Sequence, residues 1–218
     1  PINTGWHLAT NTPAGISEIG ENLTTAAMQL GKIRFWLNLP SPHQDDPFPY
    51  KLGLKNTTTG EIIESGAVKG GEFYLSVLIK DKNDLTWNGN KRWVYVFSLD
   101  IEGKIGLLFP TGSNVENLLP YDAQVQNEII ELGNRRFEIW PPFGNDTYFL
   151  LTSDEEIRYP QDVFNTEPFP QTKGGEGNLT PLERFFKDIN LSIRGTSPPA
   201  PAPKEWSIQR INILSVGQ

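Results

Sequence analysis

The sequence predicts a mainly β protein, either a two-sheet antiparallel sandwich or an open barrel, with one or two helices packed on its outside. About nine short segments rich in aromatic and β-branched residues alternate with turn formers, which is the pattern of an all-β domain. The 218 residues include 20 glycines and 18 prolines, which favours many turns over long helices. The longest apolar run, RWVYVFSLDIEGKIGLLFP at 92–110, alternates in the second half of its first strand, reverses at Glu102-Gly103 and predicts a central β-hairpin.

Residues 1–31 are expected to form an N-terminal arm or linker with one short helix. Residues 1–16 show no period and contain many turn formers. From Ser17 to Leu30, apolar side chains recur at helical spacing, with Ser17 as the N-cap and Gly31 as the stop. The alternating stretch Lys32–Leu39 predicts a strand. Residues 32–218 are accordingly interpreted as a single β-sandwich domain.

The middle of the chain predicts a succession of strands. Tyr50–Asn56 and Glu61–Ser65 flank a Thr-rich turn and form a hairpin, and Ser41–Pro49, with three prolines, is an extended loop. Further strands are expected at Glu72–Lys80, Glu128–Leu132, Arg136–Trp140 and Thr147–Thr152. The stretches 81–90, 111–127 and 154–177 are expected to be loops without a regular element.

The C-terminal part predicts one well-capped helix and a final strand. Thr180 is an N-cap, Pro181 occupies the first helical position and Glu183 completes a capping box. A Pro-rich spacer at 195–204 separates this helix from Trp206–Val216, a bent or bulged terminal strand.

The bulk composition excludes several classes of function. A net charge of −7 argues against nucleic acid and anionic membrane surfaces as partners. Because the chain has no cysteine, it has no thiol nucleophile, disulfide or cysteine-based zinc site. No signal peptide or transmembrane run is found. The chain starts at Pro1 without Met, so we expect a piece of a longer protein whose compartment stays open, the cytoplasm being slightly favoured.

No catalytic constellation can be recognised, so no catalytic residue, metal or cofactor is predicted. Only two histidines occur, both in irregular segments, and no G-x-S-x-G turn is present. His43, with Asp45 and Asp46, could offer a metal two or three ligands, but a solvated loop is the favoured interpretation. The acidic run Asp154–Glu156 lacks the spacing of a calcium loop and is also interpreted as solvated.

Two tryptophans are the best candidates for an exposed binding surface, together with one phenylalanine. Trp87 lies in a polar loop, and Trp140 precedes a Pro-Pro corner that continues into Phe143. Trp93 and Trp206 lie in strands and are expected in the core. We therefore predict a binding site that uses Trp87, Trp140 and Phe143.

Three stretches resemble a known kind of domain. They are WVYVFSLDIEGKIGLLFPTGSNVEN, FEIWPPFGNDTYFLLTSDEEI and WSIQRINILSV. Together they are similar to an uncharacterised β-rich domain, of unknown function, found C-terminal to caspase-like (peptidase C14, metacaspase-type) domains in bacterial proteins. The match covers residues 32–216 and concerns turn and core residues. It implies that the protease Cys and His lie in a preceding domain, and it carries no catalytic residue onto this chain.

Two hypotheses of function follow. The first is a non-catalytic accessory domain of a bacterial caspase-like protein, regulatory, substrate-presenting or assembling, whose partner is the preceding protease domain or another protein. The alternative is a stand-alone ligand-binding sandwich, of carbohydrate type, that uses Trp87 or Trp140. A hydrolase with a carboxylate pair is a weaker third hypothesis, because nothing selects a pair among the 26 acidic residues.

Overall fold

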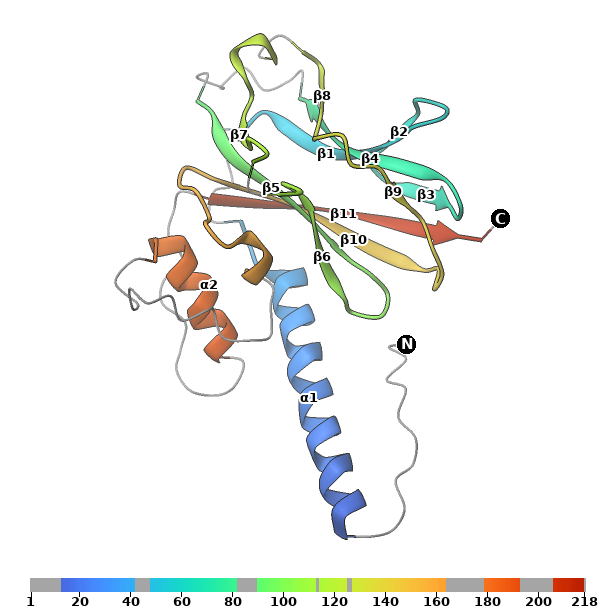
Figure 1. Cartoon of the computed structure of the whole chain (residues 1–218), viewed down its shortest axis with the longest axis vertical. Coiled ribbons are helices and arrows are strands. Elements are labelled where there is room, and N and C mark those ends of the chain that lie inside the picture. Colours follow the sequence, from blue (N-terminus) through green and yellow to red (C-terminus); the bar gives the residue numbers. More distant parts are fainter. Residues whose placement is uncertain are drawn as a thin grey trace.

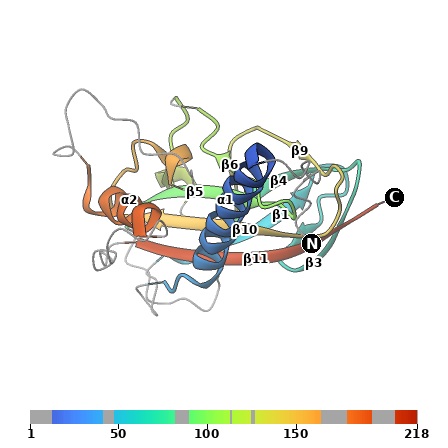
Figure 2. The same ribbon diagram turned by 90° about the horizontal axis from the view of Figure 1, so that it is seen from below.

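The computed structural model describes residues 13–41, 48–81, 90–112, 114–124, 127–163, 179–192 and 206–217. It confirms a mainly β fold with two sheets and two helices. The elements form three layers, with one sheet on the outside, the second in the middle and both helices beyond it (Figure 1). Seen from the helical side, the shorter helix lies at one end of the middle sheet, and the longer helix projects from the sheet toward the viewer (Figures 1 and 2).

The outer layer, sheet A, is antiparallel and has the strand order β2-β1-β4-β8, with β9 pairing to the other end of β4. Its strands are β1 (Tyr50–Asn56), β2 (Ile62–Ile63), β4 (Phe73–Lys80), β8 (Ile129–Glu131) and β9 (Phe137–Glu138). The predicted hairpin of β1 and β2 is confirmed, since Leu54 pairs with Ile63. The two short strands predicted around Gly133-Asn134 both pair with β4.

The middle layer, sheet B, has the strand order β3-β11-β10-β5-β6, with β7 also pairing to β5. Its strands are β3 (Gly66–Lys69), β5 (Arg92–Leu99), β6 (Ile105–Phe109), β7 (Leu118–Leu119), β10 (Asn145–Ser153) and β11 (Trp206–Val216). All its pairs are antiparallel except β3–β11, which is parallel. The final segment of the fold is therefore an interior strand of its larger sheet.

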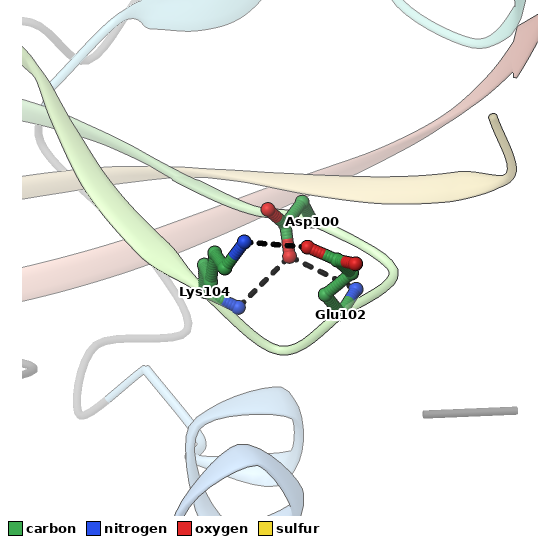
Figure 3. Close-up of polar contacts among 3 residues, drawn as sticks. All are labelled: Asp100, Glu102 and Lys104. Atoms are coloured by element: carbon green, nitrogen blue, oxygen red, sulfur yellow. Dashed lines mark hydrogen bonds and ion pairs between the residues drawn. The ribbon is translucent and has the colours of Figure 1, made fainter. Parts of the chain in front are cut away.

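The central hairpin is confirmed, and its turn is held by one carboxylate. Asp100 Oδ1 accepts hydrogen bonds from the backbone N–H groups of Glu102 at 2.9 Å and Lys104 at 2.8 Å (Figure 3). Gly103 has a φ of 82°, a conformation that residues with a Cβ rarely adopt. The Lys104 ammonium group adds an ion pair to Glu102 across the turn. This short, self-contained turn fixes the register of β5 against β6.

An inner core fills the space between the sheets, because alternate residues of each strand point into it. Sheet A contributes Leu52 and Leu54 of β1, and sheet B contributes Val94 and Val96 of β5. Gln209 of β11 links the sheets by donating through Nε2 to the carbonyl of Tyr50 at 3.1 Å. The two sheets are thus joined by both apolar packing and a polar contact.

An outer core lies between sheet B and the helices α1 (Pro13–Asn38) and α2 (Pro181–Ser192). The other faces of β5, β10 and β11 contribute, and aromatic rings dominate. The ring of Phe186 lies 5.3 Å from Trp36 and 5.7 Å from Trp206. Trp206 is fully buried, which confirms its expected place in the core. This cluster attaches both helices to the sandwich.

The prediction of a strand at Lys32–Leu39 is wrong, because α1 continues through Gly31 to Asn38. Its last turn buries Trp36 completely. The guanidinium of Arg210 donates from Nη2 to the carbonyl of Trp36 at 2.9 Å and also to that of Leu39. A cation at a helix C-terminus satisfies carbonyls that have no partner within the helix. Contacts from β11 therefore extend the helix beyond its local stop signal.

Other predictions are corrected or lie outside the described residues. The stretch 111–127 contains β7 and a short 3-10 helix at Asp122–Gln124, and β3 was not predicted at all. A second 3-10 helix, Pro160–Asp162, lies in the predicted loop 154–177. The spacer at 195–204, most of the loop 81–90 and the Pro-rich residues 42–47 lie outside the described residues. Within the described part of the chain, no helix is long and apolar enough to span a membrane.

Candidate functional site: a trough beside Trp93

A trough of about 770 Å³ opens on the outer face of sheet B, beside the first residues of β5. Trp93 and Tyr95 of β5 and Leu107 of β6 form its floor. On this face of β5, alternate residues pack into the outer core. Trp93 packs against this core but stays partly exposed. The volume lies within the range of pockets that bind small molecules or short segments of chain.

One wall of the trough is the segment after β6, residues 110–117 apart from Ser113, which lies outside the described residues. The buried side chain of Asn117 holds this wall to β5, because its Nδ2 donates to the carbonyl of Val94 at 3.0 Å. The backbone carbonyl of Asn117 accepts from the N–H of Val94 at 2.8 Å. Asn114 and Glu116 line the opening of this wall.

The opposite wall is the segment 156–161, and a buried tyrosine anchors it to the floor. The N–H of Ile157 donates to the hydroxyl oxygen of Tyr95 at 2.7 Å. Burial raises the pKa of Tyr95 to about 12, and the carboxylates of Glu156 and Glu183 act in the same direction. The hydroxyl therefore stays protonated at neutral pH, where it positions the wall.

Helix α2 supports the same wall through a fully buried carboxylate, that of Glu183. Glu183 Oε2 accepts from the N–H of Thr180 at 2.9 Å, and Thr180 Oγ1 accepts from the N–H of Glu183 at 3.2 Å. This is the predicted capping box. The other oxygen, Oε1, accepts from the N–H of Arg158 at 2.8 Å and so joins the helix to the trough wall.

The rim of the trough carries charges of both signs. Arg135, between β8 and β9, and Arg158 contribute guanidinium groups, and Glu116 and Glu156 contribute carboxylates. All four residues are exposed. Such a rim, around a floor of aromatic and aliphatic groups, suits a ligand that has an apolar body and polar or charged groups on both sides.

A second hollow of about 600 Å³ adjoins the trough on the other side of Trp93. Trp93, Glu156 and Arg158 line both hollows. The predicted acidic run 154–156 lies on this hollow and is exposed. The two hollows therefore share part of their lining, and the second also reaches Pro181, at the start of α2.

The three predicted binding residues do not form one site among the described residues. Trp87 lies outside them. Trp140 is 68% exposed, next to the exposed Pro141 and Pro142. Phe143 is partly buried against the inner core, and its ring occupies the space beside Gly70. Phe143 is thus a packing residue, whereas Trp140 is an accessible aromatic surface.

Sequence reasoning missed the trough because Trp93 was expected in the core. Its walls come from segments that are distant along the chain and were predicted only as loops. The described residues contain no cluster of three or more metal-ligating side chains, and the candidate His43 lies outside them. Comparisons with family models, with curated proteins and with solved structures give no match to this chain.

Proposed function

We propose that this chain is a non-catalytic accessory domain of a bacterial caspase-like protein, and that it acts by binding a peptide segment of a protein partner in the Trp93 trough. The observation that carries the proposal is the composition of the trough. Its floor is aromatic and aliphatic, its walls bear amide side chains, and its rim bears guanidinium and carboxylate groups. A peptide offers matching groups in its apolar side chains, its backbone amides and its charged side chains.

The rigidity of the walls supports a binding role. Tyr95, Asn117 and Glu183 each fix a wall through hydrogen bonds to backbone groups. A preformed trough loses little conformational entropy on binding. The caspase-like context comes from the resemblance of the hairpin, the corner and the terminal strand, so the partner we propose is the protease domain or a protein it engages.

The test uses the caspase-like domain that the resemblance implies precedes this chain, produced as a separate protein. Co-purification with the chain is measured first, followed by cleavage of a basic-residue reporter peptide with and without it. We expect a stable complex or a several-fold change in activity. Peptide hydrolysis by the chain alone would contradict a non-catalytic role.

A pair of charge reversals tests whether the trough is responsible. Arg135→Glu changes the rim, whereas Arg136→Glu alters the exposed neighbour that does not line the trough. We expect about 10-fold weaker binding for the first variant, as for loss of one charged contact, and unchanged binding for the second. Equal effects of both variants would move the binding surface away from the trough.

A second candidate function, carbohydrate binding, is favoured by Trp140. An exposed indole beside two prolines offers a flat, rigid surface on which a sugar ring can stack. Tryptophan fluorescence would be followed while a panel of glycans is added to the wild type and to Trp140→Ala. A change with the wild type that is lost in the variant would support this function, and a silent panel would remove it.

A further inference from the structure

The helix α1 carries a row of apolar side chains that the rest of the described chain leaves partly or largely uncovered. Leu23, Leu30 and Leu37 are 52%, 50% and 39% exposed. Only the C-terminal end of the helix, around Trp36 and Leu39, enters the outer core. Figure 1 shows the N-terminal half of α1 extending away from the other labelled elements. Large apolar side chains exposed together on one helix face indicate an interaction surface.

The spacing of these residues is that of a coiled coil. The α1 seam consists of Ile19, Leu23, Ala26, Leu30, Ile33 and Leu37, which follow one another at intervals of four and three residues. This repeat of seven residues keeps one face of a helix against a partner helix along its whole length. Leucines occupy one seam position in each repeat, and Ile, Ala and Ile occupy the other. Among the seam residues, Ile33 also contacts the domain, because it packs partly against the outer core.

The composition of α1 explains why this helix needs a partner. It contains Gly15, Gly20 and Gly31, and glycine is among the least favourable residues within a helix. Helices in water are stabilised mainly by packing of their apolar face. A helix with three glycines and an uncovered leucine row is therefore typical of one that is completed by association.

We propose that the partner is α1 of a second copy of this chain, paired antiparallel about a two-fold axis near Met28. In this register Leu23 lies opposite Ile33, Ala26 opposite Leu30 and Ile19 opposite Leu37. A seam with this spacing can pack against an identical seam. Each seam side chain of one helix inserts as a knob into a hole between residues of the other, and two identical helices do this equally. The proposal does not depend on the function of the Trp93 trough.

The distribution of charge along α1 favours the antiparallel orientation. Glu18 and Glu21 lie in the N-terminal half of α1, and Arg34 lies near its C-terminal end, all three exposed. Antiparallel pairing places Arg34 of each copy level with Asn22 of the other, one residue along from Glu21, and Gly20 beside them leaves space for the long Arg side chain to reach that carboxylate. Parallel pairing would instead place like charges at equal heights. It would also bring the two sandwiches together at the same end of a helix that is about 39 Å long.

The first experiment measures the association of the full chain by sedimentation equilibrium from low to high micromolar concentration. We expect a reversible dimer. The double variant Leu23→Glu with Leu30→Glu should weaken dimerisation at least about 100-fold, because unpaired carboxylates would be buried at the centre of the seam. Thr25→Glu places the same charge on an exposed position outside the seam and should leave the association unchanged.

Urea unfolding of the sandwich, followed in parallel, separates lost association from lost folding. Because Leu23 and Leu30 are half exposed in the single chain, both variants should give the same unfolding transition as the wild type measured below its dissociation constant. A wild-type chain that is monomeric at all concentrations would overturn the proposal. So would an unchanged dimer in the double variant.

The orientation is tested with single cysteines, since the chain has none of its own. In the antiparallel register, two Ala27→Cys thiols flank the two-fold axis on the same side and can be joined by a short bismaleimide. Two Leu23→Cys thiols lie about 15 Å apart along the helix axis and cannot. We expect covalent dimers from the first variant and none from the second. The reverse result would overturn the antiparallel arrangement.

Discussion

Glu183 on α2 accepts a hydrogen bond from the backbone N–H of Arg158 at 2.8 Å and thereby joins the helix to a wall of the trough. The same carboxylate caps its own helix through Thr180. Because the side chain is fully buried, the carboxylate has its two oxygens committed to these N–H donors.

Replacement of Glu183 by Gln tests this double role. The amide keeps the shape of the side chain, but its NH₂ group must face one of the two N–H donors, so one part-buried donor loses its acceptor. We expect the free energy of unfolding to fall by about 2 kcal/mol, as measured by urea denaturation. Glu61→Gln, at an exposed position, should change it by less than about 0.5 kcal/mol. Equal effects of the two variants would contradict the proposed anchoring.

The raised pKa of Tyr95 predicts that the protein loses stability at alkaline pH. Its pKa is raised to about 12 in the folded state, while its ordinary value is 10.0. A raised pKa means that the folded state holds its proton more tightly, so the stabilisation is complete below pH 10 and is lost as pH rises toward 12. Tyr95→Phe should therefore show a shallower decline of stability over this range, measured by urea unfolding at a series of pH values.

The same variant should also be less stable at neutral pH, by about 1–3 kcal/mol, because the buried N–H of Ile157 would lose its acceptor. Tyr121→Phe is the matched control, since the Tyr121 hydroxyl donates to the carbonyl of Glu116 at an exposed site. A solvent-exposed carbonyl can bond water instead, so a smaller loss is expected. If both variants lose the same stability, the Tyr95 bond is not a special anchor.

The close approach of Gly70 and Phe143 predicts that substitutions at these two positions have coupled effects on stability. A Cβ on Gly70 would lie 2.5 Å from Phe143 Cζ, so Gly70→Ala must displace the ring. We expect a loss of about 1–3 kcal/mol from overpacking, and about 2–4 kcal/mol for Phe143→Ala from the cavity it leaves. The double variant should lose less than the sum of the two, because the added methyl group enters the vacated space.

Urea denaturation of the three variants measures this coupling, and Gly112→Ala, with open space around its Cα, serves as the control. Strictly additive losses would show that the ring and the glycine do not share the site. A result of this kind would also reopen a binding role for Phe143.

The hydrogen bonds of Arg210 predict that this side chain attaches the C-terminal end of α1 to sheet B. Its guanidinium donates to two carbonyls at the C-terminal end of the helix, and a lysine cannot reproduce this geometry. Arg210→Lys should therefore destabilise the protein by about 1–3 kcal/mol. Amide hydrogen exchange should become faster in the last turn of α1 and stay unchanged in sheet A. Arg136→Lys, at an exposed site, should leave both measurements unchanged.

Elements of the fold could be predicted from the sequence where the local residue pattern favours the same structure as the tertiary contacts do. The hairpin of β5 and β6 combines alternating residues with its own Asp100 turn, and α2 contains its own capping box. In both cases the contacts that start the element lie within a few residues of one another, so they leave a local pattern in the sequence. The mainly β class followed from many such segments.

The errors arise where the deciding contact is distant in sequence. Ile33, Phe35 and Leu37 alternate as in a strand, yet the helix persists because Arg210 and the outer core hold its end. Residues 66–69 form β3 only because β11 lies alongside them. The trough depends on similar distant contacts, through Tyr95 and Glu183, so no local pattern identifies it.

The interior position of β11 has a consequence for how the protein is made. β11 pairs with β10 on one side and with β3 on the other, through residues 213–216 opposite 66–69. During synthesis, β3 leaves the ribosome long before its neighbour exists, and a chain interrupted before residue 206 would lack the strand that joins the two halves of sheet B. Pairing over such sequence distances is slow. Until β11 is made, the chain therefore leaves β10 with an open edge and β3 without its partner, and open edges of this kind favour pairing with other chains.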